Sequence, residues 1–247
     1  MGRPMSTITI KTVFLGPARD YAGTDAADLL APPGTTVGAF RAVLVDRFDG
    51  LRDRIEFIRM AVNAEFARDD VVLEDGDEVA LIPPVSGGTA QGAATPPGIW
   101  VDLVTGPIEV EKVREAATGD SELGGIVTFE GVTRADSDDS RGAVIRLDYE
   151  AYDAMARRQL ERMATEAKDR FSAGRVVIIH RLGSVPVGEV SVMIAVACGH
   201  RTEAFDACRW LIDELKKDAA IWKKDVFADG SVRWTEPPRE HEPRNGE

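Results

Sequence analysis

The residues with the clearest chemical meaning are two glycines, Gly87 and Gly88, at the end of the segment PPVSGG. A diglycine after a short extended run can enter a narrow channel, because glycine has no side chain and a permissive backbone. Proteins whose terminal glycine is adenylated and then loaded with sulfur, or joined to another protein, need such a tail. Here Thr89 continues the chain, so Gly88 has no free carboxylate. Either the chain is cut after Gly88, or the two glycines are only a linker.

A group of cations in the second half of the chain suggests acid–base chemistry. Lys216 is expected to close a helix and Lys223 to open the next strand, with a chain reversal between them, so both ammonium groups can point into one pocket. Two neighbouring cations lower each other's pKa, and partial burial lowers it further. A lysine tuned in this way can act as a general base or an amine nucleophile. The alternative is that Lys216 only compensates the helix dipole.

Three further basic residues fit an anion-binding pocket. His200 and Arg201 lie between the end of a strand and the start of a helix, where unsatisfied backbone N–H groups attract anions. Arginine adds a forked donor suited to phosphate or carboxylate. Arg134 ends a strand at the mouth of a loop, which suits ligand contact. The alternatives are that His200 is a capping residue and that Arg134 is simply solvated.

Composition narrows the class of protein. The chain has 247 residues, is 44% hydrophobic and carries a net charge of −12, which fits one or two globular domains and argues against nucleic-acid binding. No stretch of about 18 apolar residues occurs, so we expect no membrane span, and the N-terminus reads as a strand rather than a signal peptide. The two cysteines predict buried thiols in a cytoplasmic protein. With three histidines and no closely spaced cysteines, we expect neither a zinc site nor another cofactor.

The elements that would position these groups divide into two domains. Residues 1–88 open with a strand from Ile8, continue with a helix whose apolar stripe runs from Val37 to Phe48, and end with strands at 58–63 and 78–82. The turns PPG and EDGD separate these elements. The order of strand, helix, strands and diglycine fits a β-grasp, ubiquitin-like fold.

The remainder predicts a linker, a second domain and a tail. Residues 89–97 are small, polar and rich in Pro and Gly, which indicates an exposed linker that a protease would cut easily. Residues 98–236 predict an α+β domain with a mainly antiparallel sheet, an acidic loop at 136–142, and a disordered tail at 237–247. Its expected helices are 107–117, 153–171 and 202–217, and its expected strands are 100–104, 126–132, 144–151, 175–182, 189–198, 221–227 and 231–235.

Several ordered motifs resemble molybdopterin synthase with its small and large subunits fused in one chain. Residues 5–88 resemble the small, sulfur-carrying subunit through VFLGPARDYAG, LEDGDEVALIPPV and the Ser-Gly-Gly end. Residues 98–236 resemble the large, catalytic subunit through GGIVTFEGVTR, GRVVIIHRLG, ACGHRTEAFDA, LKKDAAIWKKD and the later Trp234. Together the two regions cover nearly the whole chain.

The resemblance implies a sulfurtransferase. In this family a thiocarboxylate on the terminal glycine of the small subunit, here Gly88, supplies sulfur to cyclic pyranopterin monophosphate, and two transfers form the dithiolene of molybdopterin. Lys216 matches the lysine at the heart of the family's active site, and Lys223 matches its second lysine. The residues that match its anion-holding pocket, and would therefore hold the substrate phosphate, are Arg134, His200 and Arg201.

The resemblance also implies partners, and it leaves alternatives open. An adenylating, sulfur-loading enzyme would act on Gly88, after a protease cuts the chain there, and the large-subunit domain would form a homodimer. A second hypothesis keeps the chain intact, with its tail docking in cis or onto a neighbouring chain. Two competing interpretations are a sulfur-carrier precursor fused to a non-catalytic anion-binding module, and a phosphate-ligand-binding protein that uses only His200 and Arg201.

Overall fold

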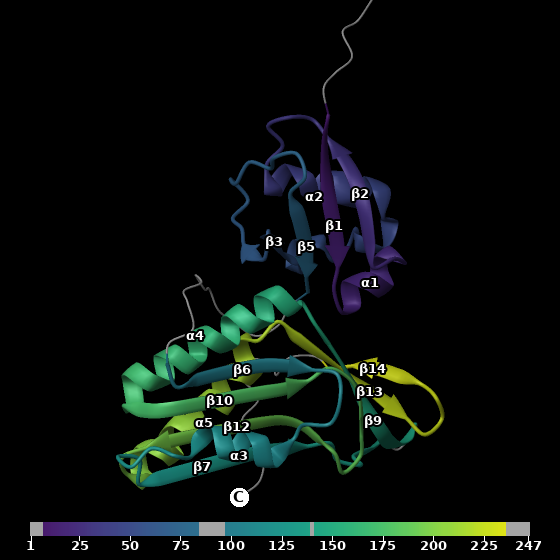
Figure 1. Ribbon diagram of the computed structural model, residues 1–247. Helices are drawn as coiled ribbons and strands as arrows, with labels where there is room; N and C mark the ends of the chain where they lie inside the picture. Colours follow the sequence, from purple (N-terminus) through teal and green to yellow (C-terminus); the bar gives the residue numbers. More distant parts are fainter. Residues whose placement is uncertain (1–6, 84–96, 139–140, 236–247) are drawn as a thin grey trace, which may run out of the picture.

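The computed structural model describes residues 7–83, 97–138 and 141–235. A smaller lobe stands on a larger one, and the end of β5 leads from the first toward the second (Figure 1). Gly87, Gly88, most of the predicted linker and the predicted tail lie outside the described residues. Within the described ranges, no helix is long and apolar enough to cross a bilayer.

The first domain is a five-stranded sheet with a helix packed against it. The strand order is β2-β1-β5-β3-β4, with β1 and β5 parallel and the other neighbours antiparallel. Helix α2 packs Val37, Phe40 and Leu44 into the core of this domain, and Thr36 caps it by accepting a hydrogen bond from the N–H of Ala39 at 3.2 Å. This is the predicted β-grasp arrangement. Its elements are β1 (Ile8–Phe14), α1 (Pro17–Ala22), β2 (Ala26–Ala31), α2 (Val37–Arg47), η1 (Asp49–Leu51), η2 (Ile55–Phe57), β3 (Arg59–Val62), β4 (Glu65–Phe66) and β5 (Glu78–Ile82).

The second domain contains two sheets. One has the order β6-β10-β12-β7, in which only β6 and β10 are parallel. The other has the order β11-β9-β13-β14, with β8 beside β9, and all of its pairs are antiparallel. The elements are β6 (Ile99–Val104), α3 (Val110–Ala117), β7 (Gly125–Val132), β8 (Ser137–Asp138), β9 (Gly142–Ala151), α4 (Asp153–Phe171), β10 (Ala173–Arg181), β11 (Gly183–Pro186), β12 (Val190–Cys198), α5 (Arg201–Asp218), β13 (Ile221–Phe227) and β14 (Val232–Trp234).

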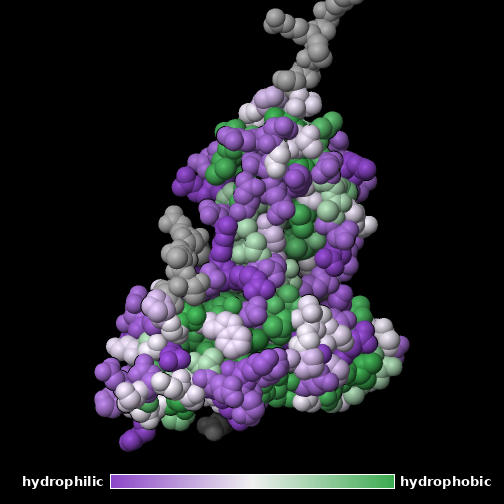
Figure 2. Space-filling view, viewed as in Figure 1, coloured by the Kyte–Doolittle hydropathy of each residue, from purple (hydrophilic) through white to green (hydrophobic). Residues whose placement is uncertain are grey.

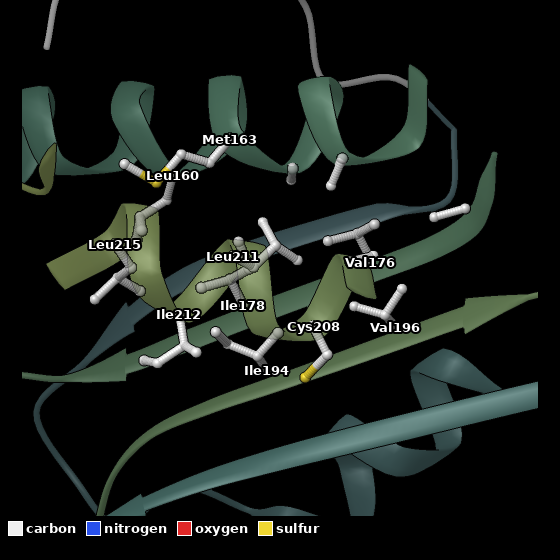
Figure 3. Packing of buried hydrophobic residues seen from close by; sticks show 14 of the residues in the cluster. Leu160, Met163, Val176, Ile178, Ile194, Val196, Cys208, Leu211, Ile212 and Leu215 are labelled. Carbon is white, nitrogen blue, oxygen red and sulfur yellow. The ribbon is translucent and has the colours of Figure 1, made fainter. Parts of the chain in front are cut away.

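The main core of the second domain lies between two helices and the four-stranded sheet. Successive side chains of a strand point to opposite faces, so β10 sends Val176 and Ile178 toward α4 and α5, and Val177 and Ile179 toward α3. Figure 3 shows Leu160 and Met163 of α4 and Leu211, Ile212 and Leu215 of α5 gathered around Ile178 and Ile194 of the sheet. Both cysteines are free and buried, as predicted, and burial raises the pKa of the Cys208 thiol to about 11.

A separate apolar cluster, here called the junction cluster, joins the two domains. Its members from the first domain are Leu15, Ala61, Ala64, Ala80 and Ile82, and those from the second are Tyr152, Met155, Ala220 and Trp222. Polar contacts surround it: the hydroxyl of Tyr152 donates to Glu78, Trp234 Nε1 donates to Asp20 at 2.9 Å, and Arg19 pairs with Glu150 at 3.0 Å. The visible surface is mainly hydrophilic, with hydrophobic side chains showing around this junction (Figure 2).

Most predicted elements are confirmed within one or two residues, but some expectations are wrong. Helix α3 begins at Val110 rather than residue 107, because Ile108 is buried in the core and Glu109 is non-helical, with ψ of 84°. The predicted loop 136–142 contains strand β8. The second half forms two sheets rather than one. The elements that the sequence patterns missed are α1, β2, η1, η2, β4 and β11.

Candidate functional site

A cavity of about 800 Å³ lies where the two sheets of the second domain meet the C-terminal end of α5. Lys216 reaches it from the last turn of α5, Lys223 from β13, and Arg134 from the segment after β7. Three of the basic residues singled out in the sequence therefore border one cavity. They come from three different elements.

In each of the pairs Lys216-Lys217 and Lys223-Lys224, local geometry turns only the first lysine toward the cavity. Consecutive residues of a helix are turned by about 100°, and Lys217 consequently points away from the cavity and pairs with Glu214 at 3.2 Å. Consecutive residues of a strand face opposite ways. Lys223 faces the cavity, whereas the Nζ atom of Lys224 lies 3.6 Å from Glu150 and 4.6 Å from the ring centroid of Trp234.

His200 and Arg201 lie elsewhere. His200 is the N-cap residue of α5, but its side chain makes no capping hydrogen bond, and both residues are exposed. Lys216 is sixteen residues further along the same helix, which corresponds to about 24 Å along its axis. Within one chain, therefore, the structure does not bring His200 and Arg201 to the cavity that Lys216 borders.

The charges around the cavity nearly balance. Arg134 pairs with Asp136 at 3.0 Å, and Arg233, which the sequence reasoning missed, pairs with Asp225 at 3.0 Å. In each pair the opposite charges largely cancel, so the pair contributes little attraction at a distance. The described lining contains four basic side chains, Arg134, Lys216, Lys223 and Arg233, against three acidic ones, Glu130, Asp136 and Asp225. An anion would therefore be held by the local position of the lysines rather than by a large positive field.

The wall of the cavity carries three neutral polar residues that the sequence reasoning also missed, the buried His180 and Ser191 and the half-buried Tyr149. Burial lowers the pKa of His180 to about 4, and the hydrogen bond of its Nδ1 atom with the Arg181 carbonyl, at 2.8 Å, offsets only part of this effect. Burial likewise raises the pKa of Tyr149. Both side chains are uncharged near neutral pH. His180 was visible in the motif GRVVIIHRLG, but a single histidine in an apolar strand gives no signal of a pocket.

The first domain ends next to this cavity. Trp222 both lines the cavity and belongs to the junction cluster, in which Ile82 is the last residue of β5. Pro83, the last described residue of the first domain, is buried. A Cβ atom added at Gly16 would lie 3.0 Å from Cγ of Trp222, so the two domains are in close contact at this tryptophan.

The part of the chain that the structure describes contains no candidate metal site built from side chains. No group of three or more His, Cys, Asp and Glu side chains converges there in a way that could hold an ion.

Comparison with known proteins divides the chain as the fold does. Residues 103–218 match the family model "MoaE protein", and residues 13–88 match the "ThiS family" model. Two curated proteins named molybdopterin synthase catalytic subunit are similar to the second half. The one from Oryza sativa subsp. indica is 49% identical over 127 residues, which are 51% of this chain and 62% of that protein. The one from Pyrococcus abyssi is 43% identical over 125 residues, covering 50% and 82%.

A solved structure agrees with this similarity. The chain is similar to molybdopterin synthase from Staphylococcus aureus, with a TM-score of 0.51 and 30% identity, over 54% of this chain and 95% of that one. The chain spans about 62% of the length of the rice relative.

Proposed function

Since this chain belongs to the MoaE family of molybdopterin synthase catalytic subunits and carries a ThiS-family domain ahead of it, we propose that it performs both parts of a sulfur transfer. The first domain carries sulfur as a thiocarboxylate on Gly88. The second domain binds cyclic pyranopterin monophosphate and receives that sulfur, in two rounds, to form the dithiolene of molybdopterin.

The observation that carries this proposal is the position of the cavity beside the end of the carrier domain. Gly88 is five residues beyond Pro83, and five extended residues reach about 17 Å. Pro83 directly follows Ile82 of the junction cluster, and Trp222 of the same cluster lines the cavity. Because Gly87 and Gly88 have no side chains, a tail that ends in them can enter a narrow opening into the cavity.

The lysines supply the chemistry. When sulfur leaves the acyl carbon of Gly88 for the pterin, that carbon must accept another nucleophile, and water restores the carboxylate. Lys216 handles the proton of that step or attacks the acyl carbon itself through its amine. Lys223 and Arg134 hold the substrate phosphate and stabilise the charge that develops during transfer.

Sulfur loading requires a free carboxylate, and Thr89 blocks it in the intact chain. We therefore propose that a protease cuts after Gly88 and that an adenylating enzyme then activates the new end. The extensive contact at the junction cluster supports retention of the cut domain by its partner. If the chain instead stays intact, the nine residues from Gly88 to Pro97 span about 30 Å, enough for docking in cis.

A role for His200 and Arg201 in phosphate binding requires a second copy of the chain, because they are a helix length away from Lys216. The outer strand β7 offers a surface for such a copy: it pairs only with β12 among the described strands, and Ile126 and Val132 on it are 43% and 46% exposed. A homodimer would then complete each cavity with residues from both copies.

The test of the function is dithiolene formation from the pterin substrate by protein that has been cut after Gly88 and converted to the thiocarboxylate. Lys216→Ala should lower the rate at least about 100-fold, whereas Lys217→Ala, on the same helical turn but outside the cavity, should stay close to wild type. Equal activity of the wild type and Lys216→Ala would favour a carrier fused to a binding module and reject the proposal. The mass of the protein isolated from its native cells shows whether the chain is cut after Gly88. If the chain is active and intact, the proposed cleavage is rejected.

The second copy has its own test. Lys216→Ala and Arg201→Ala, each inactive alone, should recover activity when mixed and allowed to exchange subunits, because a mixed dimer contains one cavity with both native residues. Absence of any recovery, in a mixture shown by mass to contain mixed dimers, would place Arg201 outside the site.

A further inference from the structure

The cavity has two chemically different ends. Its exposed rim carries Lys216, Arg134 and Arg233, whereas the residues at its inner end, His180 and Ser191, are only 4% and 5% exposed. Under the proposed function, on which this inference rests, the substrate also has two ends, a phosphate and a heterocycle with N–H donors.

The position of His180 follows from strand geometry. It lies two residues after Ile178 on β10 and therefore points to the same face, toward α5. Beyond the last residues of the main core, this face opens into the cavity. The ring stands edge-to-face against Tyr149 of the neighbouring sheet, with 4.9 Å between centroids. His180 thus sits at the seam between the two sheets.

Hydrogen bonding determines which ring nitrogen of His180 is available. A carbonyl oxygen only accepts, so Nδ1 must donate its hydrogen to the Arg181 carbonyl. In the neutral ring this leaves the lone pair on Nε2. Among the described residues, no hydrogen-bond partner is found for Nε2. The atom is also absent from the fully buried polar atoms that lack a partner there. Since His180 lines the cavity, this lone pair can accept a hydrogen bond from a ligand there.

The neighbouring Ser191 hydroxyl has the same polarity. Ser191 donates its only hydrogen to the Gly131 carbonyl at 3.0 Å, so its remaining capacity is to accept. Tyr149 stands beside His180 and near Ser191, and its phenol oxygen can accept as well as donate. The inner end therefore presents acceptors without charge. It suits N–H groups and disfavours phosphate, whose oxygens are acceptors too.

We propose that the inner end of the cavity, with Nε2 of His180 as its central acceptor, binds the N–H donors of the pterin ring, so that the phosphate faces the lysines at the rim. His180 is then a substrate-binding residue that sets the orientation of the ligand. The orientation leaves the phosphate near Lys216 and Lys223 and holds the rest of the substrate inside the second domain.

The test compares variants of the full chain by calorimetric binding of cyclic pyranopterin monophosphate and of inorganic phosphate. His180→Leu removes the acceptor and should weaken pterin binding about 10- to 100-fold, the usual effect of an unpaired buried donor, while phosphate binding stays unchanged. His180→Gln keeps an oxygen near the position of Nε2 and should stay within about fivefold of wild type. Ile179→Val, the next residue on the opposite face, is the matched control.

Each outcome decides the question. Wild-type affinity of His180→Leu for the pterin, equal weakening by Leu and Gln, or a parallel loss of phosphate binding would overturn the inference. If the Leu variant does not fold, His180→Asn replaces it, because its shorter amide does not reach the position of Nε2. These binding measurements do not depend on turnover. If the variants bind the pterin as expected but the wild type transfers no sulfur, the proposed function is rejected and the role of His180 in binding stands.

Discussion

Stability of the protein should fall steeply between pH 7 and pH 5, and His180 should account for a measurable part of the loss. Its ring is buried at the seam of the two sheets, and burial lowers its pKa from an ordinary 6.5 to about 4. In the unfolded chain the ring takes up a proton below pH 6.5, whereas the folded protein excludes that proton until the pH approaches 4. The unfolded state is therefore favoured progressively as the pH falls through this window.

The size of the effect follows from the shift. Each pKa unit corresponds to about 1.4 kcal/mol, so the complete transition costs about 3 kcal/mol. Between pH 7 and pH 5, where the folded protein still excludes most of the proton, the loss from this one group is about 2 kcal/mol. This loss is a large fraction of the free energy of unfolding of a typical globular domain, which is about 5–15 kcal/mol.

The assay is urea unfolding of the wild type and His180→Gln at both pH values, followed by a signal from the second domain. Carboxylates titrate in both proteins, so the difference between their two losses isolates the histidine. The wild type should lose about 2 kcal/mol more than the variant. Equal losses in the two proteins would refute the reasoning, because they would mean that the ring is protonated as easily in the folded state as in the unfolded chain.

Two further predictions concern the junction of the domains. Gly16→Ala should destabilise the docked arrangement by about 1–3 kcal/mol, since the residue has φ of +49° and the new Cβ would lie 3.0 Å from Trp222; a domain separation unchanged in small-angle scattering, together with an unchanged melting temperature, would contradict this. Tyr152→Phe should cost about 1 kcal/mol through loss of the hydrogen bond to Glu78. A double-mutant cycle with Glu78→Gln measures that coupling, and a coupling energy of zero would show that the contact does not hold the domains together.

Local pattern was sufficient for much of the fold. Helix α4 and strand β5 have the predicted bounds, because an apolar stripe of helical period and a short apolar run after a turn each carry their own signal. Strand β2 has the sequence AADLLA, which lacks β-branched residues, and it exists because β1 pairs with it along its whole length. Pairing of this kind cannot be read from the segment itself.

The candidate site shows the same division. The basic residues and the diglycine were recognisable by type and spacing, and the length of α5 already implied that His200 could not share a cavity with Lys216 in one chain. Charge alone groups the five basic residues, whereas their positions along α5 separate His200 and Arg201 from Lys216.

The sequence by itself determined the two domains, their order, the family and the set of basic residues available for chemistry. Only the tertiary structure decided that Lys216 and Lys223 border the cavity while Lys217 and Lys224 do not, and that His180 stands at its inner end. The physical reason is that type and spacing specify what a side chain can do and how its own element repeats. Which face of that element meets another one depends on the packing of helices and sheets whose residues are far apart in the chain.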